Sequence, residues 1–270
     1  MDATNLAAEL IELHDRPRLV PPFSARYPGL TADSGYVAAR KLHAHRLAQG
    51  WKPAGRKIGF TNRTIWPRYG VYEPMWGTVY DKTLIQSRNN KATVSLAGLV
   101  QPRIEPEICF RLKARPPASS DARDPQALLG CIEWIAHSVE IVQCHHPEWK
   151  VTIADGTTDN GLHGCLVLGT PVAVEEISGL AAALPQVKVD LMKGREMKDQ
   201  GLGSNVLDSP LLALSFLVEL LNKQPDAPPL QPGEVISTGT LTDAHPVQAG
   251  ETWRTAFTGI ALPGLEITFA

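Results

Sequence analysis

Two glutamates, Glu105 and Glu107, stand two residues apart in the apolar run QPRIEPEICFRL (101–112). Because successive side chains of a β-strand point to opposite faces, a strand here places both carboxylates on one face and Ile104 and Ile108 on the other. Two parallel carboxylates among apolar neighbours mark a place where a cation is needed. We therefore take this segment as the element around which a site is organised.

A third acid, Glu140, lies in HSVEIV between Val139 and Ile141. In a strand its carboxylate faces away from these neighbours, and an isolated acid of this kind points to solvent as readily as to a site. If all three acids converge, two charges ~4 Å apart repel by about 4 kcal/mol at an effective dielectric of ~20, and three cost on the order of 10 kcal/mol. That rivals the whole stability of a domain. Protons or a hard cation such as Mg²⁺ or Mn²⁺ must then compensate.

A polar stretch follows in ADGTTDNGLHG (154–164), with Asp155, Asp159 and Asn160. It either belongs to the site or forms a polar turn, which these residue types favour. It lacks the spacing of an EF-hand. His145 and His146 are either metal ligands or loop histidines. The second interpretation is favoured because no further His or Cys stands at a zinc-like spacing.

The composition excludes several classes of protein. The chain has 270 residues, 43% hydrophobic and 20% charged, which is typical of a globular protein. A net charge of −2 without a basic stripe argues against nucleic acid as a partner. The acidic, amphipathic N-terminus is unlike a secretory signal, and no apolar run reaches the ~20 residues of a membrane span. Four scattered cysteines predict reduced, buried thiols in a cytoplasmic protein.

Apolar periodicity and turn residues predict the elements that position these acids. Helices are expected over 4–14, from 33 or 34 to 49, over 124–136, and from Ser209 to about Leu221. The second helix is expected to bury Tyr36, Val37, Leu42 and Leu47. Strands are expected at 57–60, 101–112, 138–142, 162–168, 187–192, 234–239, 252–258 and 263–269. Strands without regular βαβ alternation indicate a mixed α+β sheet fold. No dinucleotide or P-loop motif occurs in the sequence.

The segment 67–77, PRYGVYEPMWG, has the prolines and glycines of a loop but the large apolar residues of a core. Three interpretations stay open: a lid over a site, a subunit contact, or ordinary burial.

Taken together, the ordered blocks of this chain resemble the fumarylacetoacetate hydrolase superfamily. Within it they resemble the branch of 2-keto-4-pentenoate hydratases and 4-oxalocrotonate decarboxylases of aromatic-compound degradation. The blocks span about three quarters of the chain and are RKIGFTN (56–62), GVYEPMWGTVYD (70–81), QPRIEPEICFRL (101–112), VEIVQCHHPEWKVTIADGTTDNG (139–161) and ISTGTLTDAHPVQAGETW (236–253).

The resemblance implies a single domain of the fumarylacetoacetase C-terminal type, a mixed, curled β-roll flanked by helices. Its helical cap region would cover 1–55 and its catalytic core 56–270. It also implies a homo-oligomer. The expected ligands of Mg²⁺ or Mn²⁺ are Glu105, Glu107 and Glu140. The expected catalytic residues are Lys57 and Asp155, and the expected substrate contacts are Thr238, Gly239, Thr240, Asn160, Trp76 and Glu73.

One block departs from the family pattern. Hydratases of this branch carry an acid soon after the GV, in a GVDQPDFG-like pattern, whereas this chain has Tyr72 and Met75 in place of the two acids. Glu73 is displaced by one residue. The pocket is therefore expected to be more apolar and aromatic here.

The function implied by the resemblance is a divalent-metal-dependent hydratase that adds water to a 2-hydroxy-2,4-dienoate or 2-oxo-enoate. In that chemistry Lys57 either transfers protons, with a pKa lowered by burial near the cation, or neutralises the substrate carboxylate. Thr240 would hydrogen-bond the substrate. A decarboxylase, which needs another cation such as Arg63, Arg68 or His163, and a C–C hydrolase are the alternatives. From a different class, the chain could be a non-catalytic partner of a hydratase–decarboxylase complex.

Overall fold

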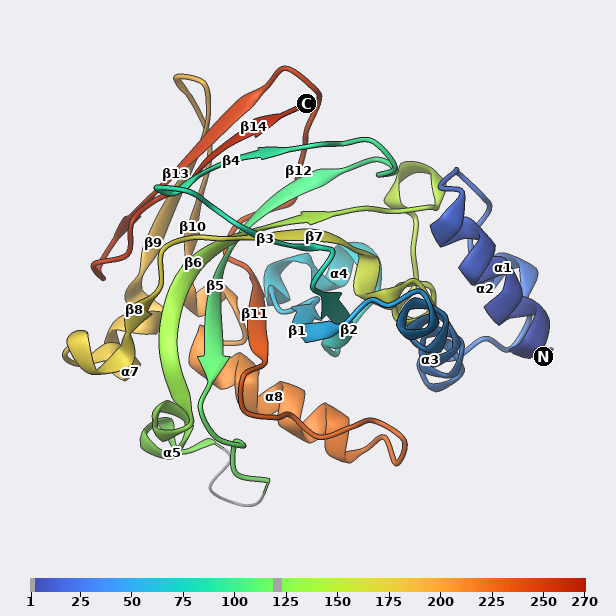
Figure 1. Ribbon diagram of the computed structural model, residues 1–270, viewed down its shortest axis with the longest axis horizontal. Coiled ribbons are helices and arrows are strands. Elements are labelled where there is room, and N and C mark those ends of the chain that lie inside the picture. Colours follow the sequence, from blue (N-terminus) through green and yellow to red (C-terminus); the bar gives the residue numbers. More distant parts are fainter. Residues whose placement is uncertain (1–2, 119–122) are drawn as a thin grey trace.

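A curled, nine-stranded mixed sheet lies at the centre of the molecule (Figure 1). The computed structural model describes residues 3–118 and 123–270. The strand order is β2-β1-β11-β5-β6-β7-β3, with β12 paired to β5 and β8 to β6. The strands are β1 (Pro53–Gly59), β2 (Met75–Tyr80), β3 (Leu84–Gln86), β5 (Arg103–Leu112), β6 (Ile132–Val142), β7 (His163–Leu168), β8 (Val172–Ala173), β11 (Val235–Thr240) and β12 (His245–Pro246).

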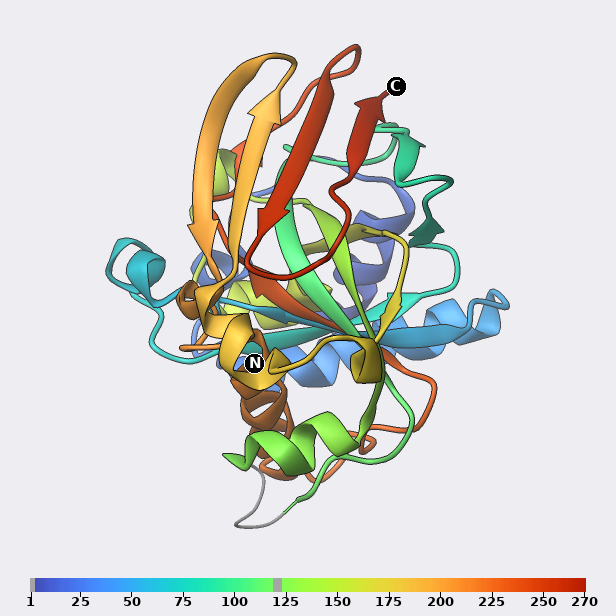
Figure 2. The ribbon, with the colours of Figure 1, turned by 90° about the vertical axis from the view of Figure 1, so that its left-hand side faces the viewer.

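A second sheet of five strands rises beside the first, as Figure 2 shows. Its order is β10-β9-β13-β14-β4. Side chains such as Val139 and Val167 from the curled sheet pack with Leu191, Trp253 and Ile267 from the second sheet. The strands are β4 (Lys91–Val94), β9 (Lys188–Lys193), β10 (Glu196–Leu202), β13 (Thr252–Thr258) and β14 (Glu266–Phe269).

Helices cover the curled sheet from two sides (Figure 1). Helix α8 (Pro210–Asn222) begins at the N-cap Ser209, whose side chain accepts from the Leu211 backbone N–H, and it packs with α5 (Pro125–Gly130). At the opposite side, α1 (Ala3–Asp15), α2 (Phe23–Arg26) and α3 (Ala32–Ala48) bury a cluster of their own. The shorter helices are α4 (Trp66–Tyr69), α6 (Ile153–Thr158) and α7 (Leu180–Ala183). The 3₁₀ turns are Arg63–Ile65, Pro147–Trp149, Asn160–Leu162, Val174–Glu176, Leu184–Gln186 and Gly203–Asn205.

These elements confirm the predicted mixed α+β class. The helix predicted over 124–136 is wrong in its second half, because α5 ends at Gly130 and β6 begins at Ile132. The spacing of Leu128, Ile132 and Ile135 imitates a helical face, although the two isoleucines lie in a buried strand.

The predicted buried face of the second helix is partly wrong. Val37 is 38% exposed and Leu47 is 45% exposed. Helix α3 instead approaches α6 through Gly35, where a Cβ would lie 2.3 Å from the Thr157 Oγ1 atom. This close approach sets the rotation of the helix and turns Val37 and Leu47 outward.

The boundary predicted at residue 55 falls inside β1, since the last N-terminal helix ends at Ala48. In the apolar segment 67–77, Val71 and Met75 are buried whereas Tyr72 is 70% exposed. Among the described residues, no helix is both long and apolar enough to cross a membrane.

Candidate metal centre and active site

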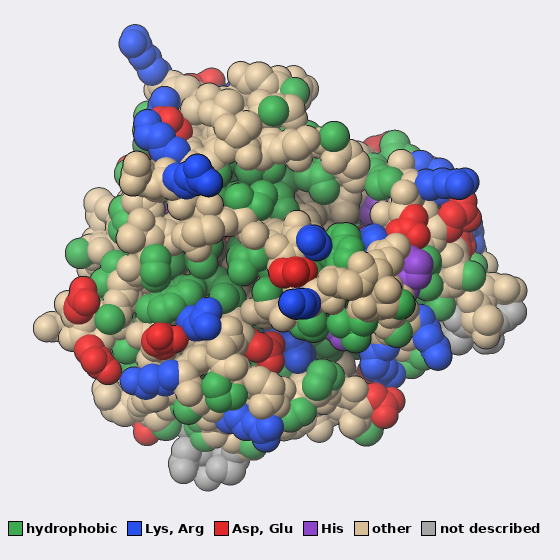
Figure 3. Space-filling view, viewed as in Figure 1, with side chains coloured by type: hydrophobic (Ala, Val, Ile, Leu, Met, Phe, Trp, Pro, Cys, Tyr) green, Lys and Arg blue, Asp and Glu red, His purple; other side chains and the backbone are tan. Residues whose placement is uncertain are grey.

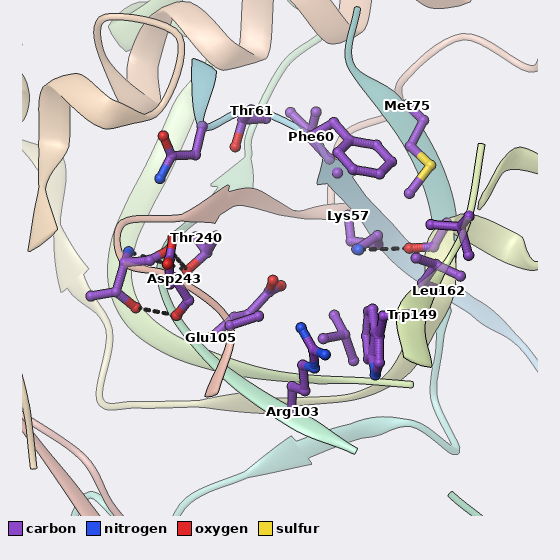
Figure 4. Close-up of a pocket in the computed structure, with 18 residues that line it drawn as sticks. Lys57, Phe60, Thr61, Met75, Arg103, Glu105, Trp149, Leu162, Thr240 and Asp243 are labelled. Atoms are coloured by element: carbon purple, nitrogen blue, oxygen red, sulfur yellow. Dashed lines mark hydrogen bonds between the residues drawn. The ribbon is translucent and has the colours of Figure 1, made fainter. Parts of the chain in front are cut away.

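A cavity lies at the ends of β1, β5 and β11 (Figure 4). Charged and apolar side chains share its lining. The charged ones are Lys57, Arg103, Glu105 and Asp243, and the larger apolar ones are Phe60, Met75, Val142, Trp149, Val151 and Leu162. The cavity therefore suits a small molecule that carries a charged group and an apolar part.

Three carboxylates meet beside this cavity. One oxygen from each of Glu105, Glu107 and Glu140 can be chosen so that all lie within 4.8 Å of one another. The pairing of β5 with β6 explains this, because Glu105 stands directly opposite Glu140 and strand alternation places Glu107 on the same face. The sequence prediction that these three side chains converge is confirmed.

The charges of these carboxylates are poorly compensated without a cation. Burial, together with the charge of Glu140, raises the pKa of Glu105 to about 7. Burial and the charges of Glu140 and Glu105 also raise the pKa of Glu107 well above its ordinary value. The Oε1 atom of Glu107 is buried and, within the described part of the chain, accepts no hydrogen bond. A cluster of hard oxygen donors with a buried, unpaired oxygen fits a divalent ion such as Mg²⁺ or Mn²⁺.

The bend in β11 fixes the orientation of Glu107. Its Oε2 atom accepts hydrogen bonds from the Ser237 hydroxyl (2.5 Å) and the Gly239 backbone N–H (3.0 Å). The pairing register shifts between Ser237 and Thr240, and Gly239 has a φ of +104°. A Cβ at Gly239 would lie 1.8 Å from the Thr61 Oγ1 atom, so only glycine fits.

The three residues predicted to form a substrate-contacting turn therefore contact different partners. Gly239 supports Glu107 through its N–H, and the Thr238 hydroxyl donates to the Ile108 carbonyl at 2.9 Å. Only Thr240 lines the cavity, where its hydroxyl donates to the Thr242 carbonyl at 3.0 Å.

Lys57 reaches the cavity from β1 and is 3% exposed. Its Nζ atom lies 3.2 Å from Glu140 Oε2 and donates to the Gly161 carbonyl at 2.8 Å. Burial lowers the pKa of Lys57, but the charges of Glu140, Glu105 and Glu107 outweigh burial and raise it. The lowering expected from the sequence assumed a bound cation beside the lysine, and it therefore stays a prediction.

His163, at the start of β7, lies behind Glu140. Its Nδ1 atom donates to Glu140 Oε1 at 2.8 Å, and its Nε2 atom lies 2.8 Å from the Thr83 hydroxyl. Burial raises the pKa of Glu140, but Lys57 and His163 outweigh burial and lower it. His163 was predicted as a cation for a second substrate carboxylate, and the structure instead places it against the metal-ligand candidate.

Of the other two predicted cations, only Arg63 has a described side chain, and it does not line the cavity. Arg63 is exposed and pairs with Asp208 at 2.7 Å. The Arg68 side chain lies outside the described part of the structure.

The acidic stretch around α6 supports the cavity from outside. Asp155 accepts hydrogen bonds from the Thr152 N–H and hydroxyl and from the Ser24 N–H and hydroxyl, and it does not line the cavity. The Asn160 amide pairs with the backbone of Thr78. These contacts fix the turn whose next residue, Gly161, receives Lys57.

Asp159 joins the N-terminal helices to this turn. Its two carboxylate oxygens accept from His14 Nε2 (2.8 Å) and His145 Nδ1 (2.7 Å). His146 lies with its Nδ1 atom 3.2 Å from the Val20 carbonyl. The two sequential histidines therefore make loop contacts. His145 also forms, with His14 and Asp159, a second group whose possible ligand atoms all lie within 4.8 Å of one another, so its two interpretations both stay open.

The segment 70–81, which departs from the family pattern, contributes one residue to the cavity, Met75. Trp76 points to the other side of the sheet, where it stacks on Tyr36 with ring centroids 5.4 Å apart and donates to Gln224. Glu73 is exposed and does not line the cavity. Neither Trp76 nor Glu73 is brought to the site.

Sequence reasoning missed Arg103, Trp149 and Phe60, all of which line the cavity. A signal for Arg103 was present: the alternation that puts Glu105 and Glu107 on one face also puts Arg103 there. Phe60 and Trp149 lie in irregular turns, where periodicity carries no information about direction.

The similarity of this chain to known proteins agrees with the geometry of the candidate site. The chain is 30% identical to 2-hydroxyhexa-2,4-dienoate hydratase of Comamonas testosteroni over 253 residues, which are 93% of this chain and 92% of that protein. It is 28% identical to 2-keto-4-pentenoate hydratase of Paraburkholderia xenovorans, over 94% of this chain and 90% of that one. No family model matches the sequence.

The fold is shared with a solved 4-oxalocrotonate decarboxylase of Pseudomonas putida G7, complexed with magnesium and adipate. The TM-score is 0.88 at 23% identity, covering 99% of this chain and 97% of that one. On these grounds the chain belongs to the fumarylacetoacetate hydrolase superfamily, in the branch of 2-keto-4-pentenoate hydratases, which are lyases, and 4-oxalocrotonate decarboxylases.

Proposed function

We propose that this protein is a divalent-metal-dependent hydratase that adds water to a 2-hydroxy-2,4-dienoate. The observation that carries the proposal is the meeting of Glu105, Glu107 and Glu140 beside the buried Lys57, at one end of a cavity with apolar walls. The family relationship supports the reaction type, since the relative from Comamonas testosteroni is a 2-hydroxyhexa-2,4-dienoate hydratase.

The three glutamates would hold Mg²⁺ or Mn²⁺. When bound, the ion supplies a Lewis acid for the carboxylate and keto oxygens of a 2-oxo acid. Gly239 and Ser237 hold Glu107 in place, and His163 holds Glu140, so the ligand set is preorganised by backbone and buried side chains.

Lys57 is the proton-transfer group in this proposal. The neighbouring carboxylates of Glu140, Glu105 and Glu107 favour the protonated form of Nζ. The ammonium can deliver its proton to C5 of the dienol while Nζ takes up the enol hydroxyl proton, which gives the 2-oxo-3-enoate. Nζ can then deliver this proton to C3 and accept one from the water molecule that adds at C4. The Gly161 carbonyl, 2.8 Å away, fixes the direction of Nζ.

The remaining walls hold the rest of the substrate. Phe60, Met75 and Leu162 surround the space into which Lys57 points (Figure 4), and they exclude water from an uncharged tail. Thr240 remains the proposed polar contact to the substrate, at the end of this space where the ion would bind.

A decarboxylase is the second candidate, favoured by one observation: the cavity contains a second cation, Arg103, in a fold shared with 4-oxalocrotonate decarboxylase. One experiment separates the two. Purified protein with Mg²⁺ or Mn²⁺ is given 2-hydroxypenta-2,4-dienoate, 2-hydroxyhexa-2,4-dienoate and 4-oxalocrotonate, and loss of ultraviolet diene absorbance and CO₂ release are followed in parallel.

A hydratase removes the diene absorbance without releasing CO₂, and the Glu107→Gln variant does not. If release of CO₂ from 4-oxalocrotonate is the only reaction observed, the protein is a decarboxylase and not a hydratase. Cleavage into two acids would indicate a C–C hydrolase. If none of the three substrates reacts and Glu105→Gln leaves metal content unchanged, the non-catalytic partner function is favoured.

We also propose that the chain works as one catalytic unit in a cytoplasmic homo-oligomer. The four free, buried cysteines support a reducing compartment. The edge strand β10 exposes Met197 and Leu202, and hydrophobic side chains gather in the hollow of the face shown in Figure 3. Light scattering of the eluting protein tests this, and a monomeric mass at micromolar concentration would contradict it.

A further inference from the structure

Arg103 differs from the other cation of the cavity in forming no close ion pair with a described acidic side chain, although its charge lowers the pKa of Glu105. Among the described side chains, no carboxylate forms an ion pair with its guanidinium, whereas Lys57 is paired with Glu140. The guanidinium instead lies over the Trp149 ring, 4.3 Å from its centroid. It points into the cavity between Glu105 and Trp149 (Figure 4).

The Trp149 ring beneath Arg103 is held in place by a segment with a strained backbone conformation. Glu148 and Trp149 both have a φ of +58°, in the left-handed region that bulky residues rarely adopt. Such residues are strained and persist only where the surrounding structure enforces them. The Trp149 indole is 8% exposed, and its N–H donates to the Gln101 carbonyl at 3.1 Å.

Gln101 enforces this conformation. Its side-chain Nε2 donates to the carbonyls of Cys144 (2.8 Å) and His146 (2.7 Å), and its Oε1 accepts from the Glu148 N–H at 3.1 Å. With the indole contact, Gln101 therefore joins the loop 144–149 to the segment that leads into β5 two residues later. Arg103 and the ring under it are thus positioned by one residue.

We propose that Arg103 is the anion subsite of this enzyme and binds the C1 carboxylate of a 2-oxo or 2-hydroxydienoic acid, an inference that rests on the proposed function. Arg103 shares a strand face with Glu105, so its guanidinium lies at the charged end of the cavity. A planar guanidinium matches a carboxylate with two parallel hydrogen bonds, and stacking on an indole preorganises it. Gln101 and Trp149 are positioning residues.

The chemistry of decarboxylation, the alternative reaction, supports the same assignment of Arg103 to the C1 carboxylate. A guanidinium can bind the second carboxylate of a decarboxylase substrate, but it stabilises the charged form of that group and so does not assist its loss as CO₂. A carboxylate that stays on the product gains from the same contact in every step. With Phe60, Met75 and Leu162 at the other end, the subsite orients the molecule with its retained carboxylate toward Arg103 and its tail toward the apolar wall.

The test measures binding of 2-oxopentanoate, a saturated acid that cannot undergo hydration, to the Mg²⁺-loaded protein by calorimetry. Arg103→Met should weaken it about 10- to 100-fold, and Arg103→Lys should weaken it less. Mg²⁺ affinity of the same variants should stay within about threefold, because Arg103 is not a ligand of the ion. Arg111→Met, an arginine on the far end of β5 that pairs with Glu133, is the matched control and should bind normally.

Trp149→Ala should weaken 2-oxopentanoate binding while Trp149→Phe, which keeps a ring under the guanidinium, restores most of it. Gln101→Ala should raise the KM for the dienoate more than it lowers kcat. Unchanged 2-oxopentanoate binding by Arg103→Met would overturn the proposal. So would loss confined to 2-oxohexanedioate, which would place Arg103 at the far carboxylate.

Two outcomes separate the anion subsite from the hydratase function. If wild-type protein binds 2-oxopentanoate through Arg103 but hydrates no dienoate, the subsite stands and the hydratase function falls. If it hydrates dienoates and Arg103→Met binds the acid equally well, the subsite falls alone.

Discussion

The Nζ atom of Lys57 lies 3.2 Å from the Oε2 atom of Glu140, and both side chains are buried. The lysine therefore sits against a carboxylate that a divalent ion would also use. In the ion-free protein this pair neutralises part of the charge of the three glutamates. If Glu140 is a ligand of the ion, as proposed, it would be shared on binding, and the proton on Lys57 would become easier to release. The same contact thus links ion binding to the state of the proton-transfer group.

Replacing Lys57 with methionine should change ion binding and catalysis in opposite directions. Mg²⁺ should bind more tightly, because a competing cation has left Glu140, whereas kcat should fall by about 10²- to 10⁴-fold because the proton-transfer group is absent. Calorimetry of Mg²⁺ binding and a diene-absorbance assay check the two effects. A matched control is Lys52→Met, on the exposed approach to β1. Retained kcat in Lys57→Met would rule out the role in proton transfer.

Glu107→Gln should separate the stability of the ion-free protein from its response to Mg²⁺. The glutamine still accepts from Ser237 and Gly239 but carries no charge, so the repulsion with Glu105 and Glu140 is relieved. We expect the ion-free variant to melt a few degrees higher than wild type, and Mg²⁺ to raise its Tm no further. Thermal melts with EDTA and with Mg²⁺ measure both. An equal Mg²⁺-induced shift in both proteins would show that the ion binds elsewhere.

His163 should control how well Glu140 binds the ion. His163→Leu removes the donor to Glu140 Oε1 and should weaken Mn²⁺ binding by about 10- to 100-fold. His163→Asn, whose amide can occupy the place of Nδ1, should recover part of that loss. Electron paramagnetic resonance of free Mn²⁺ gives both constants without an activity assay. Equal affinities in the two variants would mean that His163 only fills space.

The contact between His145 and Asp159 should give a pH-dependent contribution to stability. Burial lowers the pKa of His145, but the charge and hydrogen bond of Asp159 outweigh burial and raise it above 6.5. A raised histidine pKa contributes stability that is fully present below the unfolded-state value and is lost as the pH rises through the folded-state value. His145→Asn should therefore destabilise the protein more at about pH 6 than at about pH 8. Urea unfolding at both pH values checks this.

His14 does not reverse that result. Burial is the largest influence on the pKa of His14 and lowers it, so the contribution of His14 is present in the neutral ring and lost only as the pH falls. Comparing wild type with His145→Asn keeps His14 in both proteins. A destabilisation that grows toward about pH 8 would contradict the assignment.

The metal-ligand candidates could be predicted because strand alternation and cross-strand pairing are local rules. Glu105, Glu107 and Glu140 each alternate with buried apolar residues, and the register of β5 with β6 then brings them together. The fold class followed from the same patterns and from the family resemblance.

The supporting residues could not be predicted, because their roles depend on packing between distant segments. Asp155 and Asn160 form hydrogen bonds with Ser24 and Thr78, far from them in sequence, and nothing local indicates those partners. Trp76 alternates on the same strand as residues near the cavity, but only the packing of α3 shows that it faces Tyr36. The first half of β6 was predicted as a helix because an apolar run fits both periods.

The left-handed backbone at three cavity residues, Phe60 (φ +55°), Trp149 (φ +58°) and Leu162 (φ +62°), has a consequence for engineering. Glycine would relax the main chain at each of these positions, and a screen that rewards heat resistance alone would tend to accept such changes. The rings and the side chain that enclose the ligand would then be lost. Selection for heat resistance alone would therefore lower the catalytic activity, unless the same screen also selects for turnover.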